Sequence, residues 1–67
     1  MVHLLVEIRG PIDSEALWSE LETYGVNVTD MSERILVHGE VESYLTAVVI
    51  TGICSKYGDS KASIERR

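Results

Sequence analysis

The chain has 67 residues, and its eleven Asp and Glu against six Lys and Arg give a formal charge of −5. So short a chain forms a single domain over residues 1–67 and buries only about 60% of the surface that its unfolded form exposes. Its one cysteine, Cys54, excludes an internal disulfide and a zinc site of CxxC spacing. Because small domains without these devices commonly depend on a partner chain, we expect self-association into a dimer or tetramer.

The sequence indicates neither a targeting segment nor a membrane span. Its first residues lack the basic segment that opens a signal peptide. The longest uncharged stretch, residues 43–55, is shorter than the roughly 20 residues that cross a bilayer. With no internal disulfide possible, these features predict a soluble chain of the reducing cytoplasm that does not bind a membrane.

The first half of the chain has the pattern of a strand, a helix and a second strand. Residues 2–9 predict a strand with one buried face. One face carries Val2, Leu4, Val6 and Ile8, and the other carries His3, Leu5, Glu7 and Arg9. Gly10 and Pro11 end this strand. Asp13 is a favourable N-cap for a helix that runs to Tyr24, and Gly25 supplies the left-handed residue after it. Residues 26–31 are predicted to form the second strand.

The second half has the same order of elements. Residues 34–41 alternate and predict a third strand, and Ser43 is predicted to cap a helix that runs to Tyr57 and is closed by Gly58. The β-branched run at residues 48–51 leaves a strand as an alternative for this segment, although its length and caps favour a helix. Residues 61–65 are predicted to form a short last strand with Ala62 and Ile64 facing inward.

The two halves resemble each other at a separation of 33 residues. Both predicted helices end in Tyr-Gly, at residues 24–25 and 57–58, and the same shift aligns Leu17 with Ile50. Two such halves interleave into one four-stranded antiparallel sheet with both helices on one face. We therefore predict an α+β chain with the ferredoxin-like βαββαβ fold.

The second predicted helix is apolar over more of its circumference than one sheet requires. At 100° per residue, one side contains residues such as Ile50 and Cys54, and a second apolar side is formed by Leu45, Val48, Val49 and Gly52. One interpretation makes this second side an oligomer interface, where Gly52 lets another backbone approach closely. The other places Leu45 and Val48 beneath the first helix of the same chain.

The face of the sheet without helices is predicted to present His3 and His38 on its two central strands. In one register these histidines lie opposite each other, with Glu40 nearby, and two imidazoles with a carboxylate are candidate ligands for a transition metal. The simpler interpretation is two solvated histidines. If a dimer buries this face, the same residues would make the contact sensitive to pH.

The chain lacks the features of a nucleic-acid-binding protein or an enzyme. Sheets that stack bases present aromatic residues on their central strands, but all four aromatic residues of this chain fall on or beside the predicted helices. Cys54 lies near the C-terminal end of its helix, where the dipole disfavours a thiolate, so we expect a small buried side chain. We find no catalytic constellation and expect neither enzymatic activity nor a cofactor.

Residues 8–11, Ile-Arg-Gly-Pro, and 24–28, Tyr-Gly-Val-Asn-Val, resemble the first half of an ACT domain. In that family a glycine-containing turn leads into a helix, which ends in a glycine followed by an Asn-Ile or Asn-Val strand. The resemblance implies a βαββαβ fold that pairs between subunits and commonly binds amino acids there to regulate an enzyme. It places the ligand-binding positions at Gly10, Pro11 and Ile12 in the turn, and at Asn27.

Two hypotheses about function follow. The first is a small non-catalytic interaction module that self-associates. The second is an ACT-like regulatory domain that senses an amino acid or a similar small ligand.

Overall fold

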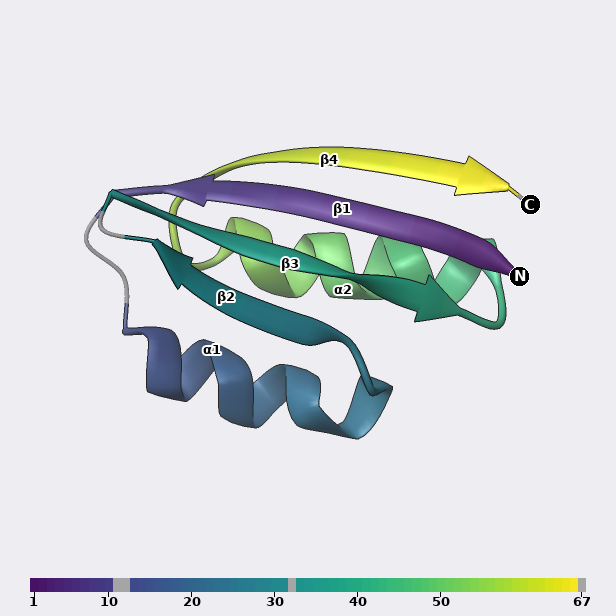
Figure 1. Cartoon of the computed structure of the whole chain (residues 1–67), viewed down its shortest axis with the longest axis horizontal. Helices are drawn as coiled ribbons and strands as arrows, with labels where there is room; N and C mark the ends of the chain where they lie inside the picture. The colour runs from purple at the N-terminus through teal and green to yellow at the C-terminus, as the bar shows by residue number, and fades with distance from the viewer. Residues whose placement is uncertain (11–12, 32, 67) are drawn as a thin grey trace.

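The computed structural model describes residues 1–10, 13–31 and 33–66. Strands form at β1 (Val2–Arg9), β2 (Asn27–Met31), β3 (Arg34–Val41) and β4 (Asp59–Arg66), and helices at α1 (Ser14–Leu21) and α2 (Tyr44–Ser55). The strands make one antiparallel sheet in the order β2-β3-β1-β4, and both helices lie on the same face (Figure 1). The predicted ferredoxin-like arrangement is confirmed.

β1 is the centre of the sheet, because it pairs along its whole length with a strand on each side. Val6 lies between Val37 of β3 and Ala62 of β4. β4 follows this pairing from Asp59 to Arg66 and is therefore longer than the predicted 61–65. Ala62 and Ile64 do lie on the helix side of the sheet, opposite buried residues of β1, but only Ile64 packs against the core. Ala62 is exposed because β4 is an edge strand.

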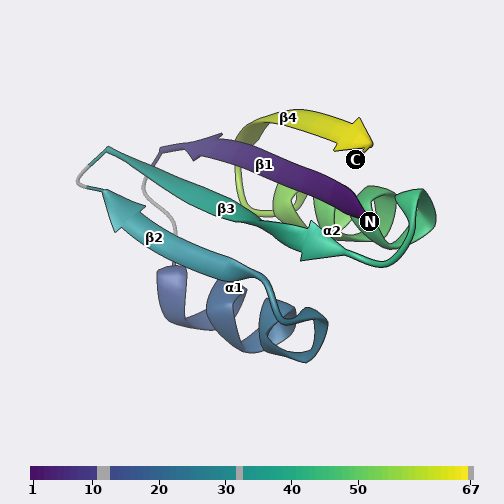
Figure 2. The same ribbon diagram turned by 45° about the vertical axis from the view of Figure 1, so that its right-hand side comes forward.

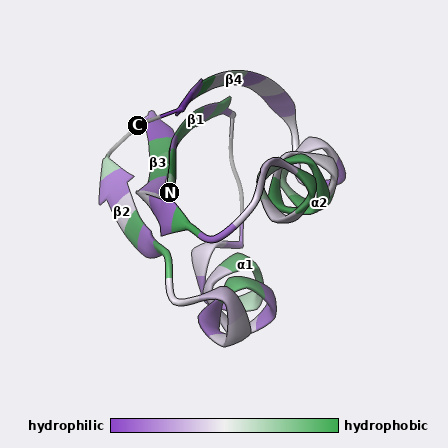
Figure 3. Cartoon of the chain, turned by 90° about the vertical axis from the view of Figure 1, so that its right-hand side faces the viewer, coloured by the Kyte–Doolittle hydropathy of each residue, from purple (hydrophilic) through white to green (hydrophobic). Residues whose placement is uncertain are grey.

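A single apolar core fills the space between the sheet and the helices. The view along the strands shows the sheet curving over both helices (Figure 3). Among the described residues no polar or charged side chain is buried. The buried residues are Val2, Leu4, Val6, Ile8, Leu17, Leu21, Val26, Ile35, Val37, Val41, Ala47, Ile50 and Cys54.

Both helices begin at the predicted caps. The Asp13 carboxylate accepts a hydrogen bond from the Ala16 amide at 3.2 Å, and the Ser43 hydroxyl accepts one from the Thr46 amide at 3.3 Å. These bonds satisfy amides that the helix itself leaves free.

The two helices end differently. A 3₁₀ turn at Glu22–Tyr24 follows α1, and Gly25 then adopts the left-handed conformation (φ 70°), as predicted. α2 stops at Ser55, two residues before the predicted Tyr57. The prediction that Gly58 closes α2 is wrong, because Gly58 does not have the positive φ of a glycine that ends a helix. Instead, the amides of Lys56 and Tyr57 bond the carbonyls of Ile53 and Cys54 in a tightened last turn.

Gly39 of β3 makes room for the chain that enters β2. Gly39 lies on the same face of β3 as the buried Val37 and Val41, which are two residues away on either side. A side chain at this position would therefore point toward the helices. A Cβ atom on Gly39 would lie 3.4 Å from the Cα of Val26, which is itself buried. The small residue lets the connection from α1 lie directly on the sheet.

Among the described residues, no helix combines the length and apolar character that crossing a bilayer requires.

The cap of α1 gives a test of the fold. Replacing Asp13 by Ala removes the bond to the Ala16 amide, and we expect the free energy of unfolding to fall by about 1 kcal/mol. Ser19→Ala, on the exposed side of the same helix, should cause no loss. Urea unfolding of both variants measures the difference, and equal stability would contradict the assigned role of Asp13.

Candidate functional site

The outer face of α2, which we define as Leu45, Val48, Val49 and Gly52, is open to solvent. The exposed fractions are 75% for Leu45, 45% for Val48 and 49% for Val49. The opposite side of the helix carries its buried residues, Ala47, Ile50 and Cys54. The interpretation that placed Leu45 and Val48 beneath α1 is therefore wrong. Figure 2 shows α1 beneath β2, to one side of α2, so it does not cover this face.

Gly52 lies at the C-terminal end of this face with empty space beside it. No heavy atom lies within 4 Å of the position that a Cβ would take, apart from the local backbone of the helix. An interior glycine costs a helix about 1 kcal/mol relative to alanine. The sequence led us to expect another backbone close to Gly52. Within the described part of the chain no backbone approaches it, so no close packing there offsets this cost.

Two hydroxyl groups of α2 donate hydrogen bonds to carbonyls of the same helix. The Thr51 hydroxyl donates to the Ala47 carbonyl at 2.9 Å, and the Ser55 hydroxyl donates to the Thr51 carbonyl at 3.0 Å. In Figure 3, much of the α2 ribbon has the colour of hydrophobic residues. The charged residues nearest to α2 in the sequence are Glu42 before the helix and Lys56 after it.

α1 and α2 meet through polar side chains near the end of α2. The Tyr57 phenol donates a hydrogen bond to the Glu20 carboxylate, and Lys56 Nζ lies 3.5 Å from Glu20 Oε1. The bond from Tyr57, together with the positive charge of Lys56, lowers the pKa of Glu20. The same bond raises the pKa of Tyr57. The sequence predicted only a solvated face for the acids of α1, because nothing in the helical spacing shows the contact across 37 residues.

The predicted pairing of the two histidines is wrong by two residues. His3 lies opposite Glu40, and His38 lies opposite Leu5. A shift of two residues leaves every side chain on its own face, so the apolar pattern does not distinguish the two registers. The observed register pairs β1 and β3 over their full lengths.

His3 and His38 have separate environments on the open face. His3 has Glu40 on one neighbouring strand and Glu65 on the other, and its Nδ1 is buried with no hydrogen-bond partner among the described residues. His38 Nε2 lies 3.4 Å from the Thr29 hydroxyl oxygen. Within residues 1–10, 13–31 and 33–66, no group of three or more His, Cys, Asp or Glu side chains is arranged to hold a metal ion.

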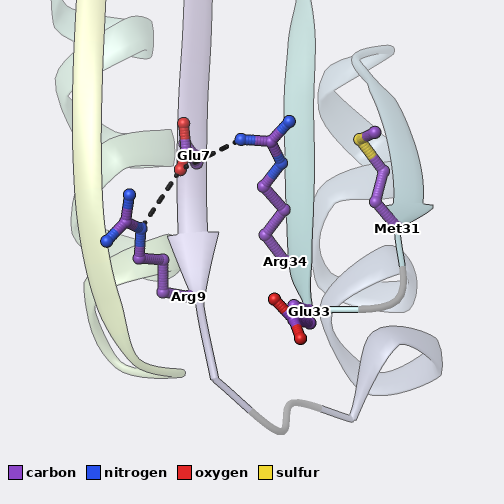
Figure 4. Close-up of a pocket in the computed structure, with 5 residues that line it drawn as sticks. All are labelled: Glu7, Arg9, Met31, Glu33 and Arg34. Atoms are coloured by element: carbon purple, nitrogen blue, oxygen red, sulfur yellow. Dashed lines mark hydrogen bonds and ion pairs between the residues drawn. The ribbon is translucent and has the colours of Figure 1, made fainter.

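A charged cluster that the sequence analysis did not identify lies at the other end of the open face. Glu7 Oε1 lies 3.3 Å from Arg9 Nε and 3.6 Å from Arg34 Nη1 (Figure 4). Together with Met31 and Glu33 these residues line a depression of about 470 Å³. The alternation places Glu7 and Arg9 on one face of β1, and Arg34 begins the neighbouring strand. The predicted fold and the alternation of side chains along β1 would together have been enough to predict this cluster.

The positions implied by the ACT-like resemblance are not all brought together. Gly10 adjoins the charged cluster, and its amide donates to the Glu33 carbonyl at 3.5 Å. Pro11 and Ile12 lie outside the described residues. Asn27 is exposed at the start of β2, whereas the cluster lies at the end of that strand, about 13 Å further along.

Cys54 is the buried side chain that its position predicted. It is fully buried against the core, and this burial raises the pKa of its thiol from 9.0 to about 11. A thiol held protonated in this way is a poor nucleophile and a poor metal ligand.

No family model, curated protein or solved structure matches this chain.

The buried thiol predicts a dependence of stability on pH. The folded state favours protonated Cys54, so this contribution is complete below about pH 9 and is lost as the pH rises toward about 11. We expect the free energy of unfolding to fall more steeply over this range in the wild type than in Cys54→Ala. Unfolding by urea from about pH 8 to 11 measures both slopes. The variant is the control for other groups that titrate there, and identical slopes would contradict the prediction.

Proposed function

We propose that this chain is a small non-catalytic interaction module of the cytoplasm that self-associates through the outer face of α2. The observation that carries the proposal is the exposure of Leu45, Val48 and Val49 on adjacent turns of one helix. Burying apolar surface contributes about 25 cal/mol per Å². A second copy would supply that burial to a domain whose own core is small.

α1 provides a comparison within the same chain. Its solvent side carries Glu15 and Ser19, with Trp18 as an exposed apolar residue beside them. A helix that covers one face of a sheet normally has such a polar outer side. α2 has the same position against the sheet but presents aliphatic side chains to solvent. Because α1 has a polar outer side, the apolar outer side of α2 is not explained by a general lack of polar residues in the chain. The difference favours an interface at α2.

The depression beside Gly10 supports a second candidate function, the binding of a small ligand of the amino-acid class. The guanidinium groups of Arg9 and Arg34 are suited to a carboxylate, and Glu33 in the same depression is suited to an ammonium group. Since this depression adjoins the turn that resembles an ACT domain, it would serve an ACT-like sensing role. Ligand binding would then accompany self-association.

Val48→Glu tests self-association. The substitution places a carboxylate in the apolar interface, where an unpaired charge is costly. We expect light scattering to show a dimer or larger assembly for the wild type and a monomer for the variant. Ser19→Glu adds the same charge to the exposed side of α1 and should leave the mass unchanged. An identical mass for wild type and Val48→Glu at every concentration would overturn the proposal.

Thermal unfolding in the presence of free amino acids tests ligand binding. A ligand that binds the folded state raises the melting temperature, and Arg34→Gln should remove that rise because it removes a guanidinium from the depression. Arg66→Gln, at the opposite end of the sheet, is the matched control.

Gly10→Val adds a test of the turn, although its φ of 112° means that any side chain there also strains the backbone. No rise with any amino acid, or an equal rise in Arg34→Gln, would contradict this second function.

A further inference from the structure

We infer that two copies of this chain pair their α2 helices antiparallel, with Leu45 of each copy packed against Gly52 of the other. The inference rests on the proposed function, since it assigns the partner and the geometry of the same face. Two observations support it, namely the shape of that face and the charges at its two ends.

Leu45 and Gly52 lie on one line along the helix. Seven residues separate them, which is nearly two turns, so their directions differ by only about 20°. Val48 and Val49 lie between them in height and about 50° to either side. The line therefore has its most exposed large side chain, Leu45, at one end. At the other end, the space beside Gly52 is empty.

Antiparallel pairing places the large side chain of each copy against the empty space of the other. A two-fold axis across the helices places Leu45 of one copy over Gly52 of the second copy, and the reverse contact follows by symmetry. The valines of both helices then meet in the middle. Parallel pairing would bring leucine against leucine at one end and leave a void between the two glycines at the other. Interiors tolerate neither overpacking nor voids.

The flanking charges favour the same direction. Glu42 precedes Leu45 by three residues, and Lys56 follows Gly52 by four. In the antiparallel pair Lys56 of each copy lies beside Glu42 of the other, so opposite charges meet at both ends. In a parallel pair, like charges would meet at each end. Antiparallel helix dipoles also oppose each other favourably.

The groups that surround the face in the single chain leave room for this partner. Lys56 contacts Glu20 of α1, but its side chain is 64% exposed and the ion pair is at the surface. Such a pair contributes little to stability. Lys56 is therefore free to reach a second carboxylate without disturbing the fold.

Disulfide trapping of two variants that each add one cysteine to the native Cys54 distinguishes the geometries. Leu45→Cys and Gly52→Cys should each fail to cross-link with themselves, since identical positions are about 10 Å apart along the antiparallel pair, beyond the reach of a disulfide. An oxidised mixture of the two variants should give a cross-linked heterodimer. The wild type is the control for Cys54, which is buried. The variants are distinguished by a mass tag on one of them.

The outcomes separate this inference from the proposed function. Self-cross-linking of each variant without the mixed product would show a parallel pair and overturn the inference, while self-association stands. A wild-type dimer with no cross-link in any sample would mean another interface, and would overturn both the geometry and the role of the α2 outer face. A wild-type monomer at all concentrations would overturn the proposed function itself.

An exchange of volumes makes the test independent of thiol chemistry. Gly52→Leu should raise the dimer dissociation constant about tenfold or more, because two leucines then compete for one space. Its fold should be intact by circular dichroism, since a Cβ at this position has no described atom within 4 Å beyond its own stretch of helix. Adding Leu45→Ala should restore the dimer. An unchanged dissociation constant in Gly52→Leu would overturn the predicted contact.

Discussion

The full-length pairing of β1 with β3 on one side and β4 on the other is the constraint on which the rest of the structure depends. It fixes the face toward which the four buried residues of β1 point, and so the face on which the helices must lie. It also brings Glu7, Arg9 and Arg34 together at one end of the open face. The outward position of the remaining half of α2 follows, since a single sheet covers only one side of a helix.

The two helices solve the same packing problem with different surfaces. Each begins at a side-chain cap and presents two or three fully buried residues to the sheet. Only α2 carries aliphatic residues on both sides. Its polar side chains do not change this balance, because Thr51 and Ser55 bond the carbonyls of their own helix. Among the described residues, α2 thus carries four of the eight exposed large apolar side chains, and the other four, Met1, Leu5, Trp18 and Met31, are scattered over the rest of the chain.

Local patterns in the sequence predict most of the fold because they reflect local physics. The alternation in residues 2–9 and 34–41 predicted both central strands, and Asp13, Ser43 and Gly25 predicted helix boundaries. The register between strands was wrong, since a shift of two residues preserves the alternation. The contact of Glu20 with Tyr57 joins elements distant in sequence, so no local pattern shows it. For the candidate site, helical spacing identified the outer face of α2, whereas its exposure depended on where α1 packs.

The strands at the two edges of the sheet bear on how copies of this chain meet. β2 has only five residues, and β4 carries Lys61, Glu65 and Arg66 along its length. Short edges and charged edges resist the addition of another strand. Growth of the sheet from copy to copy, which has no natural end and leads to fibres, is therefore disfavoured. In the proposed pairing, contact through a helix related by two-fold symmetry closes on itself after two copies, which would give an assembly of defined size.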